Sequence, residues 1–126
     1  MVKLVFCLHR LNGLSHEDFQ TYWQGTHGPL VRRYAPVLAI RQYVQVHTLD
    51  AHLNDRLRLG RGGPEPFDGV AELWWDDLEE MQRASVTPAG REANRMLLED
   101  ERRFIDLERS PLWVAEERTV VPDQGR

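Results

Sequence analysis

Alternation of apolar and polar side chains marks three stretches of the chain, residues 2–9, 40–48 and 68–76. In the first stretch Leu4, Phe6 and Leu8 point one way, and the residues between them point the other way. A period of two with β-branched and aromatic content is typical of strands in a half-buried sheet. Residues 112–120 complete the set, so the pattern predicts four strands.

A helical pattern fills the interval between the first two strands. Ser15 is a suitable N-terminal cap, and aromatic residues follow it at helical spacing as far as Tyr34. The run His27-Gly28-Pro29 interrupts this pattern, because glycine loosens the backbone and proline cannot donate to the helical ladder. We therefore predict one helix with a break or kink at His27.

The interval between the third and fourth strands also predicts helices. Asp76-Asp77 can cap a short helix, and Thr87-Pro88 opens a longer one whose inner face includes Leu97, Asp100 and Phe104. Residues 50–67 are polar and rich in Gly, Pro and Arg, which predicts a long loop. Loops of this length are usually functional lids or disordered segments, and the sequence does not decide between them.

The order of these elements is strand, helix, strand, strand, helix, strand. Two right-handed crossovers that share one antiparallel sheet give the ferredoxin-like β-α-β-β-α-β arrangement of the α+β class. We predict a single domain over residues 1–121 and a flexible tail over residues 122–126.

In this arrangement both helices cover one face of the sheet and leave the other face bare. Helices need an apolar floor, so we expect Leu4, Phe6, Leu8, Val44, Val46 and Leu73 beneath them. The bare face would then carry Cys7, His9, Tyr43, Gln45, His47, Glu72 and Trp74. This set is too aromatic to be merely solvated and too polar to be dry core. It predicts a homodimer that packs sheet to sheet and encloses a cavity.

Composition and charge indicate which partners and which cellular location to expect. The net charge of −4 argues against nucleic acid as the main partner. One cysteine permits no internal disulfide, which suits a cytoplasmic location. The N-terminal apolar run is too short for a signal peptide, and no run approaches the length of a membrane helix, so no membrane partner is expected.

Several segments resemble a known family. The stretch S-H-E-D-F-Q-T-Y-W-Q-G-T-H-G-P-L-V (residues 15–31) is similar to the first-helix motif of EthD-domain proteins. The segments F-D-G-V-A-E-L-W-W-D (67–76) and E-D-E-R-R-F-I-D (99–106) resemble the third strand and the late helix of the same family. The resemblance implies a dimeric α/β barrel. The resemblance does not define the reaction, because relatives include accessory proteins of ether degradation and decarboxylases or dehydratases of aromatic polyketide pathways. The wider superfamily adds polyketide cyclases, lactone isomerases, cofactor-free monooxygenases and haem enzymes.

His27 is the first candidate catalyst. A histidine titrates near neutral pH, and a helix break can aim its side chain into a cavity. The alternative is that His27 only hydrogen-bonds the broken helix. His47 and Tyr43 are predicted to assist, Tyr43 by donating its phenol proton to a developing enolate. The alternatives are a structural histidine at position 47 and a cavity-lining aromatic without chemistry at position 43. Asp100 lies on an apolar helix face and needs a partner, which could be His27, an arginine or a backbone amide.

The predicted substrate-binding residues line the same cavity and are His9, Gln45, Glu72, Trp74, Trp23 and Cys7. Each has a plainer structural role as an alternative: Glu72 can pair with Lys3 or Arg41, and nothing adjacent would activate Cys7 as a nucleophile. No metal-ligand spacing, phosphate loop or nucleophilic-serine motif is present, so no metal and no cofactor are expected.

The leading functional hypothesis is a cofactor-independent enzyme, a cyclase/dehydratase, isomerase or decarboxylase. Its ligand would be a small aromatic polyketide-like or lactone-like molecule, transformed by general acid–base chemistry. The alternatives are a non-catalytic ligand-binding or accessory protein of a degradation pathway, and a cofactor-free monooxygenase.

Overall fold

A four-stranded antiparallel sheet forms the centre of the computed structural model, which describes residues 1–125. Its strands are β1 (Val2–Leu8), β2 (Gln42–His47), β3 (Gly69–Trp75) and β4 (Leu112–Ala115). They lie in the order β2-β3-β1-β4. The inner strands are therefore the first and third, as two crossed β-α-β units require.

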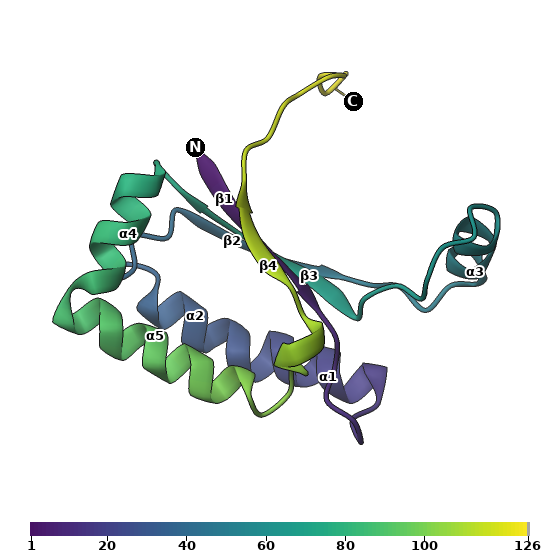
Figure 1. The fold of residues 1–126 in the computed structure, drawn as a ribbon, viewed down its shortest axis with the longest axis horizontal. Helices are drawn as coiled ribbons and strands as arrows, with labels where there is room; N and C mark the ends of the chain where they lie inside the picture. The colour runs from purple at the N-terminus through teal and green to yellow at the C-terminus, as the bar shows by residue number, and fades with distance from the viewer. Residues whose placement is uncertain (126) are drawn as a thin grey trace.

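Helices cover one face of this sheet (Figure 1). The first crossover runs through α1 (His16–Tyr22), a π-helical segment (Trp23–His27) and α2 (Gly28–Tyr34). The second runs through α4 (Leu78–Val86), α5 (Pro88–Glu101) and a short 3₁₀ turn (Leu107–Arg109). The order of elements and strands confirms the predicted ferredoxin-like fold. No helix within residues 1–125 has both the length and the apolar character needed to cross a bilayer.

The core lies between the sheet and these helices. Phe19, Trp23 and Phe104 are almost fully buried and pack on Phe6 and Leu8 of β1. Phe19 lies 5.6 Å from Trp23 and 5.5 Å from Phe104, measured between ring centroids, within the range in which aromatic pairs attract. Apolar alternation along β1 thus places its inward row as predicted.

The predicted face of β2 is wrong. Residues directly opposite each other in an antiparallel pair lie on the same face. Leu73, which faces the helices, is opposite Tyr43, and Ala71 is opposite Gln45. Tyr43, Gln45 and His47 therefore face the helices, whereas Val44 and Val46 lie on the bare face.

The physical reason is that the π-helical segment presents a main-chain oxygen and an indole ring that polar side chains of β2 contact. Gln45 Nε2 donates to the main-chain oxygen of Trp23 at 2.9 Å, and the His47 ring stacks on Trp23 with 4.6 Å between ring centroids. Strand β2 thus satisfies the π-helical segment with its polar row. Its valines stay available to a partner on the bare face.

Two further predictions of local structure are wrong in part. The predicted loop 50–67 contains a helix, α3 (His52–Leu59), and β4 ends at Ala115 instead of continuing to residue 120. Residues 116–125 form no regular element, and residue 126 of the predicted tail lies outside the described residues. Figure 1 shows α3 and the C-terminal segment reaching beyond the sheet on the side away from α1, α2 and α5. Leucines at 49, 53, 57 and 59 are exposed on and beside α3.

Gly90 is required by close packing between α4 and α5. A Cβ at this position would lie 1.9 Å from the main-chain oxygen of Ala84 and 3.0 Å from Thr87 Oγ1, the hydroxyl that caps α5. Replacing a helical glycine with alanine normally stabilises a protein by about 0.5–1 kcal/mol. For Gly90→Ala we expect the opposite sign, a loss of about 2 kcal/mol, because a backbone oxygen cannot rotate away.

Urea unfolding measures this difference, and Gly25→Ala is the matched control. Gly25 also lies in a helical segment, but a Cβ there would meet nothing within 4 Å. Gly25→Ala should leave stability unchanged or raise it slightly. Equal stabilities for the two variants would contradict the packing argument.

Candidate active site

The π-helical segment Trp23–His27 places His27 at the sheet side of the first crossover. Its wide turn lets the Gly28 N–H donate to the main-chain oxygen of Trp23, five residues earlier. Pro29 follows at the start of α2, where its missing N–H and its ring would disturb an ordinary α-helical turn. Such single π-turns are frequent at functional sites. The predicted break at His27 is thus a change of helix type rather than an interruption.

His27 forms a buried hydrogen bond with Asp100 of α5. Its Nδ1 lies 2.8 Å from Asp100 Oδ2, and both side chains are about 95% buried. Tyr22 Oη and Arg103 also donate to Asp100, at 2.5 Å and 3.0 Å. A carboxylate acceptor assigns the ring proton to Nδ1, so Nε2 carries the lone pair. The pairing of Asp100 with His27, one of the alternatives left open by the sequence, is present.

Burial lowers the pKa of His27 and outweighs the opposing effect of Asp100. The imidazole is therefore neutral near pH 7. No hydrogen bond to Nε2 is formed by any of residues 1–125. This nitrogen is a base oriented by its neighbour and available to a ligand.

His27 lines a cavity of about 340 Å³ between the sheet and the helices. The wall is mostly apolar, with contributions from all four strands and from α2, α4 and α5. Its polar members are His27, Tyr43, Ser85, Asn94 and Glu101. A concave, mostly apolar space with a few converging polar groups is the usual form of a small-molecule site.

Glu101 is the residue that the sequence analysis missed. Burial and, secondarily, the charge of Asp100 raise its pKa to about 7. No ion pair or hydrogen bond joins its carboxyl to another residue in the range 1–125. One signal could have found it: Glu101 continues the inward spacing of Ala93 and Leu97 by four residues.

Tyr43 brings a phenol to the same cavity. Its oxygen accepts from Gln45 Nε2 at 2.8 Å. Burial raises its pKa to about 12, and the nearby Glu101 carboxyl acts in the same direction. The phenol is therefore protonated at neutral pH and can donate.

His47 does not line the cavity. Its Nε2 lies 2.8 Å from Gln45 Oε1, and its ring covers Trp23. Burial, followed by the charge of His16, lowers its pKa. The geometry thus gives His47 and Gln45 a supporting position behind Tyr43, whereas Trp23 is itself part of the cavity wall.

The remaining predicted site residues lie elsewhere. Cys7, Glu72 and Trp74 alternate onto the bare face of the sheet, opposite to His27. There Lys3 Nζ lies 2.5 Å from Glu72 Oε2 and 5.2 Å from the centre of the Trp74 ring. Burial raises the pKa of the Cys7 thiol, which makes it a poorer nucleophile. The structure therefore does not bring these residues together with His27.

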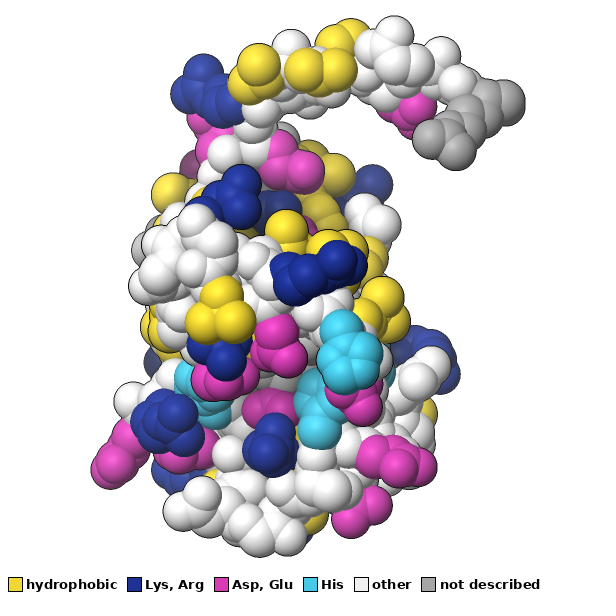
Figure 2. Space-filling model, turned by 90° about the vertical axis from the view of Figure 1, so that its right-hand side faces the viewer, with side chains coloured by type: hydrophobic (Ala, Val, Ile, Leu, Met, Phe, Trp, Pro, Cys, Tyr) yellow, Lys and Arg dark blue, Asp and Glu magenta, His cyan; other side chains and the backbone are white. Residues whose placement is uncertain are grey.

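His9 belongs to a polar region at a third place, next to the loops that lead to and from α3. Its ring lies 4.5 Å from that of Phe67, between centroids. Nearby, Asp68 accepts from Arg10 at 2.6 Å and pairs with His16 at 2.7 Å. Burial opposes ionisation of Asp68, but these hydrogen bonds prevail and lower its pKa. Figure 2 shows histidines among acidic and basic side chains on this end of the molecule.

No three His, Cys, Asp or Glu side chains within residues 1–125 are grouped as metal ligands. The polar region around Asp68 is instead joined by its own hydrogen bonds. The cavity around His27 thus offers acid–base groups to a ligand and no obvious metal centre within the described chain.

Solved structures with the same fold support this view of the architecture. An EthD family protein from Bacillus halodurans is 22% identical, with a TM-score of 0.63 over 94% of this chain and 99% of the other. A dimeric protein of unknown function with a ferredoxin-like fold, from Bacteroides fragilis, is 9% identical, with a TM-score of 0.57 over 92% and 95%. SnoaB, a cofactor-independent oxygenase from Streptomyces nogalater, is 15% identical, with a TM-score of 0.53 over 97% of each chain.

No match was found among curated proteins. The EthD domain family, by contrast, matches residues 11–108, which include the helices of both crossovers and the polar groups Tyr22, His27, Tyr43, Asp100 and Glu101. This range is well over half of the chain, and it agrees with the motifs at residues 15–31, 67–76 and 99–106. The chain belongs to the EthD domain family.

Proposed function

We propose that this protein is a cofactor-independent enzyme that moves protons on a small, largely apolar carbonyl compound. One observation carries the proposal: His27 and Glu101 face the same apolar cavity. Neither Nε2 of His27 nor the carboxyl group of Glu101 forms a hydrogen bond or ion pair with another residue in the range 1–125. Titratable groups whose pKa values are displaced in a cleft are common among catalytic groups.

The protonation states assign a role to each group. Neutral His27 accepts a proton at Nε2 from a carbon next to a carbonyl, and Asp100 stabilises the imidazolium that forms. Glu101, with a pKa of about 7, is protonated in part at neutral pH and returns a proton elsewhere on the substrate. Tyr43 donates to the developing enolate oxygen. Isomerisation, and cyclisation with loss of water, of a polyketide-like or lactone-like substrate use proton abstraction and proton return. Decarboxylation forms the enolate by loss of CO₂, and it uses only the stabilisation by Tyr43 and the return of a proton.

Proton exchange in D₂O tests this proposal without knowledge of the final product. A panel of aryl ketones, 1,3-diketones and unsaturated lactones is incubated with the protein, and loss of the α-proton signal is followed by NMR. We expect exchange faster than in protein-free samples for a subset of the panel. Compounds that bind but exchange at the protein-free rate would instead favour a ligand-binding protein.

A cofactor-free oxygenase is the second candidate. The observation that favours it is the likeness to SnoaB, whose chain this fold covers almost completely. The same proton abstraction by His27 would form an electron-rich carbanion, the species that can react with O₂. Oxygen consumption with an exchanging compound distinguishes the two candidates.

We further propose a homodimer through the bare face of the sheet. Val46 is 44% exposed and Trp113 is 48% exposed there, and α3 and the C-terminal segment extend on the same side. The Bacteroides fragilis protein of the same fold is dimeric. A second sheet would cover Val44 and Val46, which the helices leave bare.

Sedimentation velocity at micromolar concentration tests this interface. The wild-type chain should sediment as a dimer, and Val46→Lys should sediment as a monomer, because an unpaired charge would be buried at the interface. Val86→Lys, at an exposed valine of α4 on the helix side, is the matched control and should remain dimeric. A monomeric wild-type protein would overturn the proposal.

A further inference from the structure

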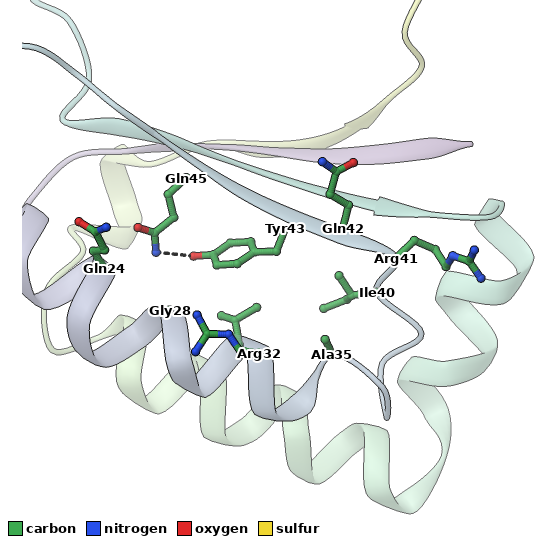
Figure 3. Close-up of a pocket in the computed structure, with 10 residues that line it drawn as sticks. Gln24, Gly28, Arg32, Ala35, Ile40, Arg41, Gln42, Tyr43 and Gln45 are labelled. Carbon is green, nitrogen blue, oxygen red and sulfur yellow. Dashed lines mark hydrogen bonds between the residues drawn. The ribbon is translucent and has the colours of Figure 1, made fainter.

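A second hollow, of about 380 Å³, lies between α2 and strand β2, at the edge of the sheet (Figure 3). Three residues, Val31, Ile40 and Tyr43, line both this edge groove and the cavity around His27. The two spaces are therefore divided by a single layer of side chains. A ligand that reaches past Tyr43 would occupy both.

The edge groove has an unusual charge. Its lining includes two arginines and three glutamines, and it contains no acidic residue, although the chain has 20 acidic against 16 basic residues. Arg32 has no ion-pair partner among residues 1–125. Arg41 approaches Asp76 only at 3.6 Å, and both of these side chains are more than half exposed. Guanidinium N–H groups are donors suited to a carboxylate, whereas both amide hydrogens of Gln45 are used within the protein.

The position of Arg32 has a simpler partial explanation. Arg32 and Arg33 lie in the last turn of α2, where the helix dipole favours a cation. That effect applies equally to Arg33, whose guanidinium lies over the Tyr34 ring at 5.5 Å. It does not account for Arg41 or the glutamines of the facing strand. Arg32 is therefore the cation that the groove offers to a ligand.

Tyr43 connects the groove to the cavity chemically as well as spatially. Gln45 uses its two amide hydrogens on the main-chain oxygen of Trp23 and on the Tyr43 oxygen, and Figure 3 shows the second of these bonds. Its own oxygen is occupied by His47. The hydroxyl proton of Tyr43 therefore has no acceptor in this network and remains for a ligand at the boundary.

We propose that the edge groove is a carboxylate-binding subsite, in which Arg32 holds the acid end of a substrate whose apolar body extends past Tyr43 into the cavity. The substrate class is thus a small organic acid whose apolar body carries the reacting carbonyl. This inference rests on the proposed function for the use of the cavity. The recognition of the carboxylate is nevertheless measurable without turnover.

Isothermal titration with two matched probes tests it. The probes are 1-naphthaleneacetic acid and its primary amide, which share the apolar body and differ in the charged end. We expect the wild-type protein to bind the acid about tenfold more tightly than the amide, since a charge-assisted hydrogen bond has about this effect. Arg32→Gln should remove the preference and leave binding of the amide unchanged. Arg33→Gln changes the net charge identically and should keep the preference.

Three results would overturn the proposal: no binding of either probe, equal affinities in the wild-type protein, or a preference that survives Arg32→Gln. Failure of the proposed function would give a different combination of results. A preference for the acid that disappears in Arg32→Gln, together with no proton exchange for any compound, would retain the subsite and reject the enzyme. Proton exchange without any preference for the acid would retain the enzyme and reject the subsite.

Discussion

Replacing His27 with alanine is expected to lower the rate of α-proton exchange by about two to four orders of magnitude, the usual contribution of a positioned general base. Nε2 of His27 is oriented by the 2.8 Å bond between Nδ1 and Asp100, and water does not reproduce that arrangement. NMR exchange rates in D₂O measure the effect with the most rapidly exchanging compound.

The control variant is His52→Ala, which removes an exposed histidine at the start of α3. It should exchange at the wild-type rate. Thermal unfolding of His27→Ala shows whether any loss of rate arises from unfolding, since Asp100 keeps its bonds from Tyr22 and Arg103. A folded His27→Ala protein with a rate close to that of the wild type would remove His27 from the mechanism.

Glu101 is expected to make the protein less stable as the pH rises. Its folded pKa is about 7, raised from 4.5, so the folded state binds this proton more tightly than the unfolded state does. The contribution to stability is present below about pH 4.5 and is lost as the pH rises through 7. A shift of this size corresponds to a loss of about 3 kcal/mol at alkaline pH.

Urea unfolding at several pH values between 4 and 8.5 measures this loss, with the variant Glu101→Gln as the comparison. The amide does not titrate, so the free energy of unfolding of Glu101→Gln relative to wild type should increase across this range. Glu99→Gln, at an exposed residue paired with Arg95, is the control and should follow the wild type. Parallel pH profiles for wild type and Glu101→Gln would contradict a raised pKa.

Most of the fold could be predicted because local patterns and overall topology agree. Ser15 and Thr87 cap helices where the sequence places them, and the alternation along β1 identifies its inward row. The helix α3 was missed because its leucines are exposed and the glycines at 60–63 dominate the local pattern. An amphipathic helix with no packed face lacks the signal that would identify it.

The site was predictable only in part, because alternation separates the two faces of a strand without saying which face meets the helices. On β2 the apolar row of Val44 and Val46 suggested the helix side. The decisive group was the main-chain oxygen of Trp23, which Gln45 satisfies. Glu101 was missed for a related reason: its importance comes from burial, and a carboxylate on a helix is usually solvated.

The π-helical segment Trp23–His27 predicts a pattern among related sequences. A π-turn contains one residue more than the α-turn that it replaces, and each residue of a helix rotates the following side chains by about 100°. A relative that lacks this one residue would carry an ordinary helix here, and its histidine would no longer point into the cavity. Across related sequences, a single-residue gap between Trp23 and His27 should therefore coincide with loss of the His27–Asp100 pair.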